Sequence, residues 1–157
     1  MTEQPLRQQR RGKRVAMTSD EVDQFLTAEH TCRVGTMNAR GPHVTPLWYL
    51  WHGGAVWLYS ITGSQRWKDL EADPRIAVLV DAGIDYFELR GVEITGTVTQ
   101  VGETPRVGEP NAELADVEHS FARKYMGGDD MVYDERHAWL RVDPEKLTSW
   151  DFRKIAG

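Results

Sequence analysis

The sequence predicts a mainly β protein, an antiparallel barrel with few, peripheral helices. About six or seven segments have the alternating or β-branched composition of strands, whereas three have the apolar spacing of a helix. Short turn signals such as "NARGP" and "HGG" separate successive strands, which favours antiparallel neighbours. Many strands with helices only at the periphery are typical of a barrel.

The length and composition indicate one domain. With 157 residues, 40% of them hydrophobic, the chain is long enough for one core and short for two, and we expect a single domain over residues 16–157. The single cysteine, Cys32, excludes an internal disulfide and a CxxC metal site, and it indicates a reducing compartment. No segment reaches the roughly 18 apolar residues of a membrane helix, and the N-terminus has no signal-peptide core. We therefore expect a cytoplasmic protein with no metal and no membrane partner.

Charge is unevenly distributed along the chain. The formal net charge is −5, but residues 1–14 hold five basic residues against one glutamate, a sum of +4. The basic residues are Arg7, Arg10, Arg11, Lys13 and Arg14. We expect residues 1–15 to form a basic, disordered leader, with contact to an anionic ligand as the alternative. The rest of the chain is acidic and would repel a phosphate backbone, so no nucleic-acid partner is expected.

Local signals predict the three helices. The first begins at Thr18, which lies three residues before Glu21 in a capping-box spacing, and runs to about residue 29. The second is short, begins after Ser64 and ends at "DPR". The third is stopped by "GG" at 127–128. Its apolar side consists of Leu114, Val117, Phe121 and Tyr125.

The strands follow in order between these helices. "TCRVGTM" comes first, and then "HVTPLWYLW" and "AVWLYS", which we expect to pair as an antiparallel hairpin through "HGG". "IAVLVDAG" is short and almost wholly apolar. "FELRGVEITGTVTQVG" is long, with Gly91 and Gly96 as expected bends or bulges. "HAWLRVD" and "KLTSWDF" are expected as two closing strands around Pro144.

The segment "TGSQRWKDL", residues 62–70, has the composition of an anion cradle. Ser64 suits a helix N-cap, and the N–H groups that follow such a cap carry partial positive charge. Arg66 and Lys68 add full charges. Neutral donors come from Ser60, Thr62, Ser64 and Gln65. A capped surface helix with two solvated cations has the same pattern, and this alternative stays open.

Several ordered pieces carry a resemblance to a known family. They are "PHVTPLWY", a strand that ends at Ser60, "SQR" at 64–66, "DPR" at 73–75, "LRGVEITGTV" and "SWDFRK". Together they resemble the FMN-binding split β-barrel superfamily, which contains the pyridoxamine 5′-phosphate oxidases. The pattern is most similar to the actinobacterial group B of flavin/deazaflavin oxidoreductases, which depend on F420.

The resemblance implies a six-stranded, Greek-key split barrel that forms a homodimer with two cofactor sites at its interface. The backbone of Val44, Thr45, Pro46 and Leu47 would follow the ring system of the cofactor. Ser60 and Thr62 would lie near its ribityl chain, and Ser64, Gln65, Arg66 and Lys68 near its phosphate. Trp150 and Arg153 would come from the partner subunit. The chain is rich in tryptophan, which suits either an interface or a core.

Two departures from the oxidases bear on the cofactor and the reaction. The oxidases carry Arg-Lys where this chain has Gln65-Arg66, so one cation is missing from the expected phosphate site. Fewer cations suit the singly charged phosphodiester of F420 better than the phosphate monoester of FMN, which is the alternative cofactor. The Arg-x-His substrate motif of the oxidases is also missing from "WDFRKI", so oxidation of pyridoxamine phosphate is not expected.

The function that these expectations favour is an F420-dependent reductase that transfers a hydride to an activated double bond of a small molecule. Hydride chemistry belongs to the cofactor and demands no catalytic acid or base, and no catalytic residue is identified. His43 borders the expected ring-contacting strand as a candidate proton donor, or as a structural histidine. The alternatives are an FMN-binding oxidoreductase and a non-catalytic carrier of a cofactor such as haem.

Overall fold

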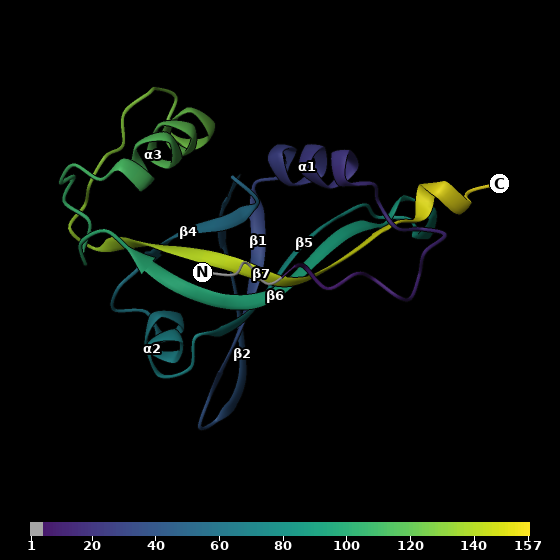
Figure 1. The fold of residues 1–157 in the computed structure, drawn as a ribbon, viewed down its shortest axis with the longest axis horizontal. Helices are drawn as coiled ribbons and strands as arrows, with labels where there is room; N and C mark the ends of the chain where they lie inside the picture. Colours follow the sequence, from purple (N-terminus) through teal and green to yellow (C-terminus); the bar gives the residue numbers. More distant parts are fainter. Residues whose placement is uncertain (1–4) are drawn as a thin grey trace.

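A computed structural model describes residues 5–157, which form one strongly curled antiparallel sheet with helices at its periphery (Figure 1). The strands are β1 (Thr31–Asn38), β2 (Gly41–Trp48), β3 (Leu50–His52), β4 (Ala55–Ile61), β5 (Arg75–Ala82), β6 (Arg90–Val101) and β7 (His137–Asp151). The helices are α1 (Ser19–Ala28), α2 (Gln65–Ala72) and α3 (Ala112–Tyr125), with two short 3₁₀ helices, η1 (Tyr86–Glu88) and η2 (Phe152–Ile155). The spatial order is β2-β1-β5-β6-β7-β4-β3.

The mainly β, antiparallel fold class is confirmed, with seven strands in the described residues instead of six. The expected hairpin between "HVTPLWYLW" and "AVWLYS" is wrong in its pairing. Residues 41–48 pair with β1, and only residues 50–52 pair with β4. The run breaks at Tyr49, whose N–H and carbonyl group both bond the hydroxyl of Tyr125 while its own hydroxyl donates to Leu26 O at 2.5 Å. These contacts remove Tyr49 from the ladder.

The two expected closing strands are one continuous strand, β7. Pro144 lies opposite Gly96 and Lys146 opposite Thr95, so Glu145 is an extra residue that β7 absorbs as a bulge. The expected irregularity at Gly96 is confirmed. A Cβ at Gly96 would lie 2.1 Å from the carbonyl oxygen of Asp143, so the bulge requires glycine.

The helix starts follow their sequence signals. Thr18 Oγ1 accepts the N–H of Glu21 at 3.2 Å, and Ser64 Oγ accepts that of Trp67 at 3.1 Å. The side chain of Asn111 caps α3 through the N–H groups of Glu113 and Leu114. α1 buries Val22, Phe25 and Leu26, and α3 buries Leu114, Val117 and Phe121 of its predicted apolar side. Among the described residues, no helix is long and apolar enough to cross a membrane.

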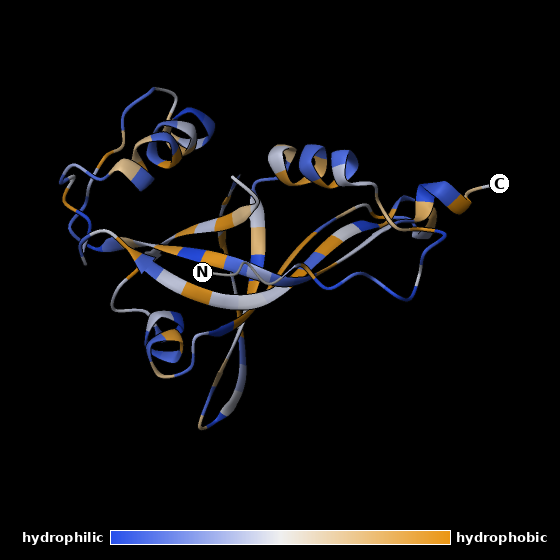
Figure 2. Ribbon diagram, in the orientation of Figure 1, coloured by the Kyte–Doolittle hydropathy of each residue, from blue (hydrophilic) through white to orange (hydrophobic). Residues whose placement is uncertain are grey.

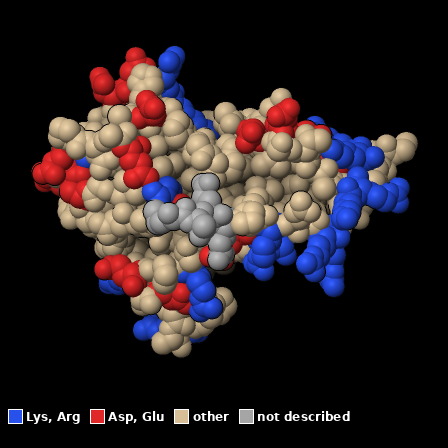
Figure 3. Space-filling view, in the orientation of Figure 1, with Lys and Arg blue, Asp and Glu red and all other residues tan. Residues whose placement is uncertain are grey.

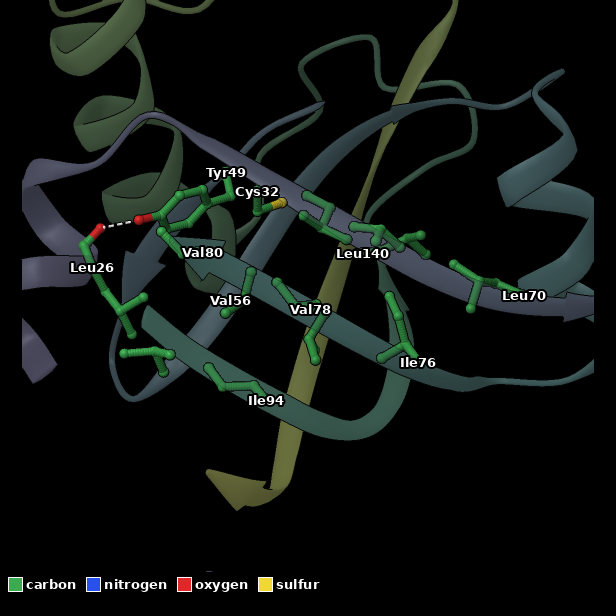
Figure 4. Close-up of a cluster of buried hydrophobic side chains, with 14 of the residues drawn as sticks. Leu26, Cys32, Tyr49, Val56, Leu70, Ile76, Val78, Val80, Ile94 and Leu140 are labelled. Atoms are coloured by element: carbon green, nitrogen blue, oxygen red, sulfur yellow. Dashed lines mark hydrogen bonds between the residues drawn. The ribbon is translucent and has the colours of Figure 1, made fainter. Parts of the chain in front are cut away.

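Two apolar clusters lie on the two faces of β4 and β7. The main core fills the curl of the sheet and is closed by α1 and α2 (Figure 4). The second lies between α3 and the sheet and contains Trp57, Trp139 and Phe121. Hydrophobic and hydrophilic residues alternate along β7, as the hydropathy colouring shows (Figure 2), and this pattern matches a strand with two different faces. Trp57 and Trp139 are therefore core residues, whereas Trp48 is 52% exposed.

Residues 5–15, which belong to the expected leader, lie along β7. Arg7 N–H donates to Glu145 O at 2.9 Å, and the side-chain amide of Gln9 exchanges two hydrogen bonds with the backbone of Ser149. Asp151 N–H donates to Val15 O at 2.7 Å. Because β4 pairs with β7 only up to Val142, this segment covers the strand edge that β4 leaves free. The rest of the expected leader, residues 1–4, lies outside the described residues.

Candidate functional site

Arg66 joins three elements, β2, β4 and α2. Its Nη1 donates to Thr45 Oγ1 at 2.6 Å, and its Nε donates to Ser60 Oγ at 3.2 Å. Ser60 is fully buried because it faces the inside of the curled sheet. Thr45 points to the same side of β2, which alternates between half-buried and exposed residues. The structure therefore brings together three of the residues that were expected to hold a cofactor.

The first turn of α2 leaves backbone donors beside this arginine. Ser64 Oγ takes the N–H of Trp67, and Ser64 O takes that of Lys68 at 3.2 Å. The N–H groups of Gln65 and Arg66 belong to the first helical turn and have no acceptor among residues 5–157. Arg66 thus lies next to a helix N-terminus whose partial charge has the same sign as its own.

No carboxylate pairs with Arg66 in the described part of the chain. Burial lowers the pKa of its guanidinium, and nearby Cys32 opposes this only weakly. Cys32 is itself fully buried, and burial raises the pKa of its thiol to about 12. The half-buried cation is therefore held by neutral hydroxyl groups alone. Such a site favours an anion, because an anion replaces the water that the guanidinium has lost.

A buried carboxylate, Asp69, fixes the other side of α2. It accepts hydrogen bonds from Gln65 Nε2 at 2.7 Å, Thr36 Oγ1 at 2.7 Å and Asn38 Nδ2 at 3.1 Å. These donors lower the pKa of Asp69, and burial partly opposes them. Asp69 therefore braces the helix against β1, and Gln65 is bonded to this carboxylate within α2, whereas the sequence suggested a free donor for phosphate.

His43 faces this carboxylate from β2. Its Nδ1 lies 3.6 Å from Asp69 Oδ2, is buried, and has no hydrogen-bond partner among the described residues.

Sequence reasoning did not assign Asp69, Thr36 or Asn38 to the site. Only one local signal was available, the spacing of four residues that puts Gln65 and Asp69 on one face of a helix.

The remaining expected residues near α2 lie around the Arg66 cluster but do not join it. Thr62 donates its N–H and its hydroxyl to Arg136 O, at 2.9 and 3.1 Å, which ties β4 to the loop before β7. Lys68 is exposed and makes no side-chain hydrogen bond or ion pair within the described residues. Val44 and Pro46 point outward, with Val44 65% exposed, and Leu47 packs against the main core.

Trp150 and Arg153 make no contact with the Arg66 cluster in the same chain. Ser60 pairs with Ala138 near the start of β7, whereas Trp150 lies twelve residues further along this strand, opposite Gly91. Trp150 packs over Gly91, where a Cβ would come within 2.3 Å of its ring. Arg153 forms a two-pronged ion pair with Asp151 and thereby lowers the pKa of that carboxyl group.

A second buried arginine, Arg106, has a different environment. Two of its nitrogens donate to Glu118 at 3.0 and 2.8 Å, and a third bonds Glu103. Tyr133 and Trp139 also donate to Glu118, at 3.0 and 2.9 Å. The hydrogen bonds that Arg106 donates to the carboxylates raise its pKa, although burial opposes them. This cluster is fully paired and fastens the middle of α3, at Glu118, to β7.

Comparisons with known proteins agree on one family. A family model described as pyridoxamine 5′-phosphate oxidase matches residues 18–151. The conserved hypothetical protein Rv2991 from Mycobacterium tuberculosis is 26% identical in sequence, with 96% of this chain and 94% of that chain covered and a TM-score of 0.77. No curated protein matches the chain significantly.

Two further solved structures share the fold at lower identity. An FAD-binding protein (mll6688) from Mesorhizobium loti is 20% identical, covers 85% of this chain and 93% of its own, and has a TM-score of 0.65. An F420 reductase is 18% identical, covers 80% of this chain and 94% of its own, and has a TM-score of 0.60.

Proposed function

Because the chain belongs to the pyridoxamine 5′-phosphate oxidase family, we propose that it is an oxidoreductase that binds the deazaflavin F420 beside Arg66. When bound and reduced, F420 would supply a hydride to an activated double bond of a small molecule. The family includes members with different cofactors and substrates, so the choice of cofactor depends on this chain's own residues.

The observation that carries the proposal is the unpaired charge of Arg66. A half-buried guanidinium held by Thr45 and Ser60, beside two unbonded N–H groups, fits a phosphate group. An ordinary surface arginine would be solvated, and a structural one would meet a carboxylate. The proposed role of Arg66 is to bind and orient the phosphate, and that of Thr45 and Ser60 is to hold the guanidinium in place.

The charge count supports F420 over FMN. The side chain of Gln65 is bonded to Asp69, so the site offers one fixed cation together with neutral donors. The phosphodiester of F420 carries one negative charge, whereas a monoester such as that of FMN carries about 1.5 to 2 at neutral pH. A flavin such as FMN stays the second candidate, because a structural neighbour is an FAD-binding protein and so binds a flavin.

A second copy of the chain would complete the site. Trp150 and Arg153 make no contact with the Arg66 cluster within one chain, and in this proposal they reach the cofactor from a partner subunit. The outer side of β2 offers an apolar surface for such a dimer. It exposes Val44 by 65% and Trp48 by 52%, and Met37 of β1 is 49% exposed.

The first test is a parallel titration of the protein with F420 and FMN, followed by fluorescence. We expect tight binding of F420 and weaker binding of FMN, and a loss of affinity in Arg66→Ala. Arg75→Ala is the matched control, since it removes a nearby exposed cation that is already paired with Asp73 at 2.7 Å. If the protein binds FMN more tightly than F420, FMN takes the place of F420 as the proposed cofactor. Binding of neither cofactor would overturn the proposal.

A further inference from the structure

The N-terminal segment is fastened to the sheet at both ends. We call residues 7–15 the basic strap. The Arg7 N–H and the Gln9 amide hold one end to β7, and the carbonyl group of Val15 holds the other end to Asp151. Between these anchors the strap turns at Gly12, whose φ of 65° suits glycine, and Val15 N–H closes the turn on Gly12 O at 3.1 Å. The cations between the anchors are thus carried on a folded turn.

A groove of about 920 Å³ runs between this strap and the outer face of β6 and β7. Its floor consists of Glu93, Lys146 and Thr148, which point away from the main core. Residues 5–11 and Lys13 form its wall. Its volume lies within the range of small-molecule sites and is small for a macromolecular partner.

The groove concentrates positive charge in a protein whose formal net charge is −5. Its cations are Arg7, Arg10, Arg11, Lys13 and Lys146, and Glu93 is the single carboxylate among the described residues that line it. None of these five side chains forms an ion pair or a hydrogen bond with another described residue. Figure 3 shows Lys and Arg gathered at this end of the molecule, while Asp and Glu cover α1 and α3. Like charges held around one groove repel each other, and a bound anion would relieve the repulsion.

The lining also indicates which anion the groove would take. Arginine forks bind phosphate and carboxylate groups, and here they follow one another along the strap. Within residues 5–157 no aromatic side chain lines the groove, so this lining offers no stacking surface for a nucleobase. These features favour an extended, non-aromatic molecule with several negative groups.

We propose that the basic strap and the outer face of β6 and β7 form a second binding site, for an oligoanion with three or more phosphate or carboxylate groups. The site is separate from Arg66, and the inference does not depend on the proposed function. The binding energy of this second site comes from several exposed cations that act together, so binding weakens strongly as the salt concentration rises.

The test uses the full-length protein and inorganic tripolyphosphate, with calorimetric titration at low salt and orthophosphate as the singly phosphorylated comparison. We expect tripolyphosphate to bind more tightly than orthophosphate. The triple substitution Arg10→Ala, Arg11→Ala and Lys13→Ala should weaken tripolyphosphate binding by about tenfold or more. It leaves the anchors at Arg7, Gln9 and Val15 intact, and an unchanged melting temperature would show that the strap is still folded.

Two controls separate this site from the rest of the molecule. Substituting alanine for Arg40, Arg75 and Arg123 removes the same charge from other surfaces and should leave the affinity nearly unchanged. Arg66→Ala removes the proposed cofactor site and should retain the strap-dependent binding. The inference is overturned by an absence of binding, by equal losses in both triple variants, or by tighter, strap-dependent binding of a 20-nucleotide single-stranded DNA.

Discussion

Arg106 meets two carboxylates, whereas Arg66 meets two hydroxyl groups. Both guanidinium groups are withdrawn from water, Arg106 to 3% exposure and Arg66 in part. Around Arg106, Glu118 and Glu103 supply the opposite charge, and the pKa of the arginine rises. Around Arg66, Thr45 and Ser60 supply acceptors without charge, and the pKa falls because burial is not compensated.

We propose that this difference separates a structural site from a binding site. A buried ion pair is complete by itself, and the loss of one partner leaves the other charge unpaired. An uncompensated cation costs stability in the free protein and gains its partner when an anion binds. The two arginines should therefore respond in opposite ways to the same substitution: one in stability, the other in binding.

The largest expected effect is that of Arg106→Met on stability. The substitution leaves Glu118 buried without its cation, so the free energy of unfolding should fall by about 3–5 kcal/mol. Urea denaturation followed by tryptophan fluorescence measures this change. The double variant with Glu118→Gln should recover part of the loss, because the buried negative charge is then also removed. A fall of less than about 1 kcal/mol in the single variant would mean that solvent already reaches this cluster.

Arg66→Ala should show the opposite pattern. Affinity for the cofactor should fall by about 1.5–3 kcal/mol, the range for hydrogen bonds to charged groups. The free energy of unfolding should stay within about 0.5 kcal/mol or rise, since an uncompensated cation is removed. Parallel cofactor titration and thermal unfolding measure both quantities. Strong destabilisation with unchanged affinity would make Arg66 a second structural arginine and remove the contrast.

The Arg106 cluster should also make stability depend on pH. Burial opposes ionisation of Glu103, but hydrogen bonds from Arg106 and from the backbone lower its pKa from 4.5 to about 2. Because the folded-state pKa is depressed, this contribution is fully present above pH 4.5 and is lost as the pH falls towards 2. It is on the order of 2 kcal/mol after screening.

Urea midpoints of the wild type and Glu103→Gln at pH 5, 4 and 3 test this dependence. The wild type should lose more stability than the variant across that interval. Glu71→Gln, which removes an exposed carboxylate without an ion pair, should follow the wild type. Parallel curves for all three proteins would place the pH dependence outside the Arg106 cluster.

The sequence was sufficient to predict features of the site and the fold that depend on local interactions. The cap at Ser64 links residues three positions apart within the segment singled out as an anion cradle, and Ser60, which Arg66 contacts, was named as a neutral donor beside that segment. The bulge at Gly96 was likewise indicated by one residue. A short spacing combined with a restrictive residue type leaves few alternatives.

Contacts between distant segments could not be predicted. The pairing of β2 depends on the contact of Tyr49 with Tyr125, 76 residues later, and no local pattern encodes that contact. Asp69 is held by Thr36, which lies 33 residues earlier on another strand. The sequence therefore indicated the cation of the site but not the carboxylate that fixes the helix beneath it.

The smallest expected effect concerns the hydroxyl groups that hold Arg66. Ser60→Ala removes one neutral acceptor at 3.2 Å, and cofactor affinity should fall by about 0.5–1.5 kcal/mol with little change in stability. If Ser60 acts only by orienting the guanidinium, the same substitution in the Arg66→Ala background should have no further effect, and the double-mutant cycle measures their coupling. Additive losses would mean that Ser60 contacts the ligand directly. In that case the site would bind through a ring of separate donors, and the uncompensated charge of Arg66 would be one contribution among several.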